Sequence, residues 1–145
     1  MSPSSLASGL LLAAWSMTLA PQLAAEEPES AAQAKVGAHT FREYCRSCHG
    51  AEAKGDGPVG KYLSPKPADL TLIRARNRGE FPFDEVYAAI ASGKAVKGHG
   101  SSEMPVWGSA FREVRGGQSE ESVAERIRQL VHYVQSIQAE AKPRR

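Results

Sequence analysis

The sequence predicts a helical protein, because its periodic segments have helical spacing and turn-forming residues separate them. Apolar residues recur at helical intervals before Cys45, over residues 84–92 and again after Ser119. The stretches between these segments are rich in Gly-Pro and Ser-Pro turn chemistry. The chain has 145 residues, which is a usual length for one domain.

The N-terminal segment has the character of an export signal. Residues 1–25 contain no Asp, Glu, Lys or Arg; residues 6–20 form an apolar run, and Leu-Ala-Ala at 23–25 offers a cleavage region. We therefore assign residues 1–25 to a secretory signal peptide and expect a periplasmic protein. An uncleaved membrane anchor is the alternative, although the run is shorter than the roughly 20 apolar residues of a span. We expect no membrane span in the mature chain.

The first helix of the domain is expected from about Lys35. Residues 26–34 are acidic, alanine-rich and poor in large apolar side chains, so they predict a flexible lead-in. The apolar positions of the helix that follows are Val36, Phe41 and Tyr44, and they run into Cys45. Gly37 is unusual there, because glycine costs about 1 kcal/mol relative to alanine inside a helix. Its presence suggests close approach of another helix.

Two more helices are expected further along the chain. A short one covers residues 84–92 and ends at Gly93. The last begins after Ser119, a good N-cap residue, and fades near Glu140. Its apolar positions are Val123, Ile127, Leu130, Val131, Val134 and Ile137. We therefore place the domain at residues 35–141, followed by a basic tail at 142–145.

Cys45-Arg46-Ser47-Cys48-His49 contains both cysteines of the chain, and C-x-x-C-H is the attachment pattern of c-type haem. Residues three apart on a helix face the same side, so both thiols can reach one macrocycle. A redox C-x-x-C would follow a strand, a zinc site would need a second ligand cluster, and a plain disulfide would leave the histidine unexplained. The pattern predicts one haem bound through Cys45 and Cys48, with His49 as an axial ligand.

Met104 is the predicted sixth ligand of the iron. It is the sole methionine outside residues 1–25, and it lies in a loop, directly before Pro105. Proline restricts the backbone there, and a thioether is a known partner of histidine in cytochromes. The competing histidines are His39, His99 and His132. His99 is the nearest of them, five residues before Met104, while the other two are expected on helices as surface or packing residues.

These motifs resemble those of class I c-type cytochromes of the bacterial monohaem type, over about residues 36–138. Gly37 and Phe41 stand eight and four residues before Cys45, as in that family's first helix. Leu130 and Tyr133 are similar to the Leu-x-x-aromatic pattern of its last helix. The loop motifs Gly-Asp-Gly-Pro at 55–58 and Met-Pro-Val-Trp at 104–107 are similar to those of bacterial members.

The resemblance implies an all-α, cytochrome c-like fold, in which the N- and C-terminal helices cross and short helices and loops surround one covalently attached haem. It further implies that a proline carbonyl accepts a hydrogen bond from the axial histidine, for which Pro58 is the candidate. Trp107 is a candidate haem-pocket residue, either as a donor to a haem propionate or as an aromatic wall.

The expected function is single-electron transfer between redox proteins, by a carrier that is not itself an enzyme. The charge is nearly balanced, with 18 basic and 16 acidic residues, which argues against a nucleic-acid partner. Two alternatives stay open. The glycine-rich stretch before Met104 also suits a haem protein with a labile sixth position that binds a small ligand. The small size also suits a dedicated electron-entry subunit of an oxidoreductase complex.

Overall fold

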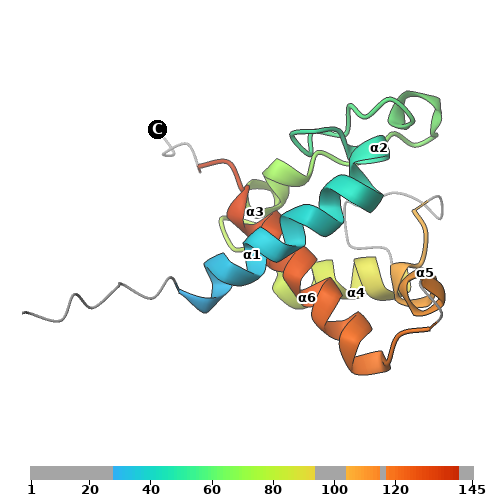
Figure 1. Cartoon of the computed structure of the whole chain (residues 1–145). Coiled ribbons are helices and arrows are strands. Elements are labelled where there is room, and N and C mark those ends of the chain that lie inside the picture. Colours follow the sequence, from blue (N-terminus) through green and yellow to red (C-terminus); the bar gives the residue numbers. More distant parts are fainter. Residues whose placement is uncertain (1–27, 94–103, 115–116, 141–145) are drawn as a thin grey trace, which may run out of the picture.

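The computed structural model describes residues 28–93, 104–114 and 117–140, and the regular structure within these ranges is helical (Figure 1). This confirms the predicted all-α class. The elements are α1 (Glu29–Thr40), the π-helical turn η1 (Phe41–Cys45), α2 (Arg46–His49), the 3-10 turns η2 (Gly60–Tyr62) and η3 (Leu70–Leu72), α3 (Ile73–Arg76), α4 (Phe83–Ser92), α5 (Trp107–Glu113) and α6 (Glu120–Ser136).

The predicted crossing of the first and last helices is present (Figure 1). Gly37 lies at the contact between them. A Cβ atom on Gly37 would lie 1.9 Å from the backbone oxygen of Gln129 and 3.0 Å from the backbone nitrogen of Leu130. Only glycine lets the two helix backbones come this close. The unfavourable helix propensity of Gly37 is therefore explained by the packing of α1 on α6.

The first helix begins at Glu29, so the prediction of a flexible lead-in over residues 26–34 is wrong from residue 29 onward. The backbone N–H groups of Ala31 and Ala32 donate to the carbonyl of Pro28, and Glu29 lies in the first turn, where a negative charge is favourable. The buried residues of α1 are Ala34 and Gly37. Because this buried face consists of small residues, a search for large apolar side chains places the start of the helix too late.

Val36 is 49% exposed, in contrast to its predicted place on the buried stripe, whereas Phe41 is 1% exposed. Helices α1, α4 and α5 pack against α6, and the hydrophobic core lies between them. The N-cap of α6 is Ser119, whose hydroxyl accepts from the backbone N–H of Ser122. The predicted apolar face of α6 is buried as expected, with Ile137 half-buried at its end. The other buried core residues are Phe41, Ala53, Leu70, Ile73, Val86, Ile90 and Phe111.

The helix expected at 84–92 is α4, and Gly93 ends it with a left-handed φ of 65°. α5 has seven residues, too few for helical periodicity to be apparent, and it was not expected from the sequence. The predicted signal peptide at 1–25, residues 26 and 27, His99 and the predicted tail at 142–145 lie outside the described residues. Among the residues that the structure does describe, no helix is both long and apolar enough to cross a membrane.

Candidate haem-binding site

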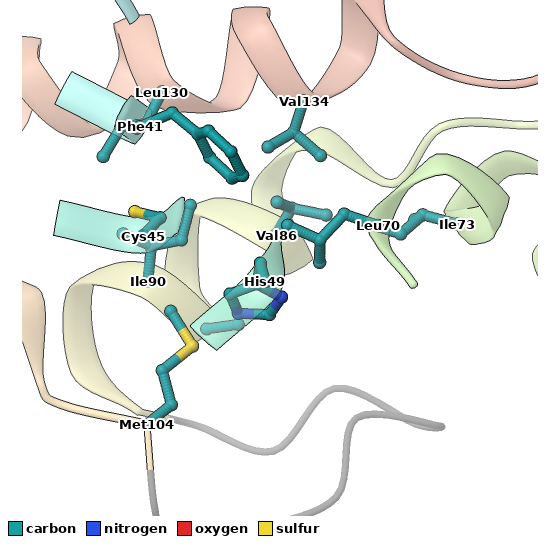
Figure 2. Close-up of a pocket in the computed structure, with 11 residues that line it drawn as sticks. Phe41, Cys45, His49, Leu70, Ile73, Val86, Ile90, Met104, Leu130 and Val134 are labelled. Atoms are coloured by element: carbon teal, nitrogen blue, oxygen red, sulfur yellow. The ribbon is translucent and has the colours of Figure 1, made fainter. Parts of the chain in front are cut away.

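A cavity opens between the Cys45–His49 turn, α4, α6 and the segment that carries Met104 (Figure 2). It contains about 520 Å³ of empty space, part of which is open to solvent. The side chains around it are almost all apolar. They are Phe41, Cys45, His49, Leu70, Ile73, Val86, Ala89, Ile90, Met104, Leu130 and Val134. Mostly apolar lining with few polar groups is typical of a cofactor site.

His49 supplies the nitrogen donor of this cavity. The residue is 9% exposed, and its Nδ1 lies 3.1 Å from the carbonyl oxygen of Ala68. Burial lowers the pKa of His49 and outweighs the opposing effect of the hydrogen bond to Ala68. The ring is therefore neutral at neutral pH, and with Nδ1–H donating to Ala68 its Nε2 keeps a free lone pair. A neutral imidazole oriented in this way is a good metal ligand.

Met104 supplies a sulfur donor to the same cavity. Its side chain is half-buried, and Figure 2 shows the thioether and the His49 ring directed into one space from different parts of the chain. The structure thus brings together the histidine and the methionine that the sequence predicts as partners, although Met104 lies 55 positions after His49 (104 − 49).

Cys45 and Cys48 are free thiols, and Cys45 lines the cavity. Burial, with a smaller effect from nearby Cys48, raises the pKa of Cys45 to about 12. A reactive thiol of a redox C-x-x-C has a lowered pKa, so Cys45 does not have the character of a redox nucleophile. Cys48 is half-buried and is not among the side chains that line the cavity.

A comparison with models of protein families finds that residues 32–115 match the family described as cytochrome c oxidase, cbb3-type, subunit III. The chain belongs to this family. It is a c-type cytochrome domain of the class I kind, and haem-based electron transfer is the chemistry of such a domain. The match includes the C-x-x-C-H motif and Met104, and it ends before α6. No curated protein and no solved structure matches the chain.

The donor set fits the haem c that this family implies. The cytochrome presents a neutral imidazole with a free Nε2, a thioether on a separate segment, two free cysteines and a wall of aliphatic side chains. Cys45 and Cys48 would hold such a haem covalently, and His49 would ligate its iron.

The Nδ1–H of His49 donates to the carbonyl of Ala68, and the prediction that the carbonyl of Pro58 accepts this hydrogen bond is wrong. Pro58 is exposed, because its loop folds back over the end of α2. There the N–H groups of Gly55, Gly57 and Val59 donate to the carbonyls of His49, Cys48 and Ser47, respectively. The loop therefore caps α2 rather than supporting the imidazole ring. In the sequence, Ala68 belongs to the turn-rich stretch at 64–69. Residue spacing does not show that this stretch contacts His49.

The aromatic-wall interpretation required Trp107 to line the cavity, but Trp107 is not among the residues that line it. Its ring lies 5.1 Å from the ring of Phe111 and 5.7 Å, edge-on, from that of Tyr44. Trp107 begins α5 three residues after Met104, so this aromatic cluster anchors the Met104 segment of the cytochrome from one side. The alternative role of Trp107, as a donor to a haem propionate, stays a prediction.

His39 and His132 are not ligand candidates in the described structure. His39 is exposed on α1, and the His132 ring packs 4.9 Å from the ring of Phe83. Neither lines the cavity. Both therefore have the surface or packing roles that the sequence predicts for them.

Proposed function

We propose that this cytochrome is an exported single-electron carrier whose haem iron is held between His49 and Met104. The observation that supports this most directly is the entry of both side chains into one apolar cavity. A thioether opposite an imidazole favours ferrous iron and raises the reduction potential, as in other cytochromes with this ligand pair.

The roles of the residues follow from their surroundings. When bound, the haem supplies a reversible one-electron couple. His49 is held neutral by burial and oriented by Ala68, so its Nε2 is ready to ligate. Met104 would complete six-coordination, which leaves little to rearrange on electron transfer. The aliphatic wall excludes water and helps set the potential. No side chain has to make or break a bond during electron transfer.

Export to the periplasm is part of this proposal. It is supported by the uncharged, apolar segment at residues 1–25 and by the need of covalent haem attachment for two free thiols. In the less favoured form of the proposal, residues 1–25 are not cleaved and anchor the protein in the membrane.

The ligand pair is tested by Met104→Ala. We expect the ferric wild-type protein to show the charge-transfer absorption band of thioether-ligated iron, and the variant to lose it, because alanine offers no sulfur. Val106→Ala is the matched control: Val106 is 43% exposed two residues away, and its variant should keep the band. Rapid stoichiometric binding of carbon monoxide to the reduced wild-type protein would overturn the proposal in favour of a haem with an open sixth position.

A second candidate function, a dedicated electron-entry subunit, is favoured by the description of the matching family as an oxidase subunit. Affinity purification of the tagged full chain from detergent-solubilised membranes tests it. A dedicated subunit is expected to recover one oxidoreductase in a fixed ratio at high salt. Recovery of the cytochrome alone, with electron transfer to several acceptors, would support the free carrier.

A further inference from the structure

The carbonyl that orients His49 belongs to a segment with little regular structure. Residues 68–74 include Ala68, the turn η3 and the first residues of α3. The segment stabilises itself locally through Asp69, whose carboxylate accepts from the backbone N–H of Thr71 at 2.9 Å and from its hydroxyl at 2.6 Å. The N–H of Leu70 donates to the carbonyl of Ala53 at 2.8 Å. These bonds shape the segment but do not attach it to the helical core.

Leu70 and Ile73 of this segment pack in the hydrophobic core, and the side chain of Gln138, at the end of α6, adds hydrogen bonds to it. Its amide nitrogen donates to the carbonyls of Leu70 and Val134, both at 2.7 Å. Its amide oxygen accepts from the backbone N–H of Arg74 at 2.8 Å. Gln138 thus links both ends of the short helical stretch in residues 68–74 to the last turn of α6.

Next to Gln138, the backbone N–H of Ala139 donates to the carbonyl of Thr71 at 2.9 Å. Within the described part of the chain, no other side chain from α6 or from the residues after it hydrogen-bonds to residues 68–74. The Gln138 side chain is half-buried, so these bonds are partly shielded from competing water. Within the described residues, Gln138 is the side-chain hydrogen-bond link between the end of α6 and the segment behind His49.

We propose that Gln138 is a positioning residue for the axial histidine. By holding residues 68–74 against α6, it keeps the Ala68 carbonyl within hydrogen-bonding distance of His49 Nδ1. A hydrogen bond at Nδ1 fixes the ring orientation and raises the basicity of Nε2 toward a metal. A more basic ligand stabilises ferric iron, so Gln138 lowers the reduction potential of the cytochrome. The inference rests on the proposed ligation by His49, but not on the identity of the sixth ligand.

The test uses the haem-loaded full chain with Gln138→Met. Methionine has a similar length and volume, but it cannot replace the amide donors. We expect an upward shift in reduction potential, seen as a several-fold higher ferrous-to-ferric ratio at a fixed ambient potential. We also expect faster solvent exchange of the His49 Nδ1–H proton, measured by NMR. The thioether charge-transfer band of the ferric protein should be unchanged.

Two control variants separate positioning from general loss of stability. Gln135→Met makes the same change three residues earlier, where the side chain forms no hydrogen bond within the described residues. Ser119→Ala removes the cap at the far end of α6 and lowers stability without touching residues 68–74. Both should keep the wild-type potential. A Gln138→Met protein that loses stability but keeps the wild-type potential and Nδ1–H exchange would overturn the proposal.

A measurement on the wild-type protein keeps the proposal testable if Gln138→Met does not fold. Both amide protons of Gln138 are expected to exchange with solvent much more slowly than those of Gln135, because each has a carbonyl acceptor. Equal exchange rates would overturn the proposal. If the ligand-pair proposal fails, the wild-type ferric protein lacks the thioether charge-transfer band. This result does not depend on Gln138.

Discussion

The Cys45→Ser, Cys48→Ser double variant is expected to lose its haem completely in a denaturing gel. Wild-type protein should keep the haem under the same conditions, because thioether bonds to the two cysteines survive unfolding whereas axial ligation by His49 does not. Haem-dependent peroxidase staining of the gel measures the difference. Both thiols are free and belong to one turn, which is the arrangement that attachment requires.

Ser47→Ala is the matched control for this variant, since Ser47 lies between the two cysteines and is exposed. Its haem staining should equal that of the wild-type protein. If the double variant does not accumulate, each single cysteine variant should keep one covalent bond and change the absorption of the alkaline pyridine complex. A double variant that keeps its stain would contradict covalent attachment through Cys45 and Cys48.

Replacing Gly37 by alanine is expected to lower the free energy of unfolding by about 3 kcal/mol, as an overpacked contact does. The added Cβ would lie 1.9 Å from the Gln129 oxygen and 2.4 Å from its carbonyl carbon. These are helix-backbone atoms, so α1 and α6 would have to separate. The gain in helix propensity, about 1 kcal/mol, does not compensate for the lost contacts. Denaturant unfolding followed by circular dichroism measures the change.

Val36→Ala is the control in the same turn of α1. Val36 is 49% exposed, so its truncation should change stability by no more than about 0.5 kcal/mol. A Gly37→Ala protein as stable as the wild type would show that α1 and α6 do not cross at this glycine. The two variants together therefore test the crossing itself rather than helix propensity.

Predictions from periodicity agree with the structure where large apolar residues form a helix face. The apolar positions of α6 are an example, and its Ser119 cap depends on a contact only three residues away. The same reasoning placed the start of the first helix too late and Val36 in the core. Helix α1 packs through Ala34 and Gly37, because these small residues let the α6 backbone come close. A search for large apolar residues does not detect such a contact.

By itself, the sequence determined the chemistry of the site: two thiols and an imidazole on one turn at Cys45–His49, and a single methionine outside residues 1–25. Such groups are identified by residue type and short spacing, because one helical turn sets their geometry. Only the tertiary structure decided what supports them. The acceptor for His49 is Ala68 rather than Pro58, and Gln138 holds that acceptor from the far end of the chain. The physical reason is that a backbone carbonyl is present at every residue, so its position depends on how distant segments pack.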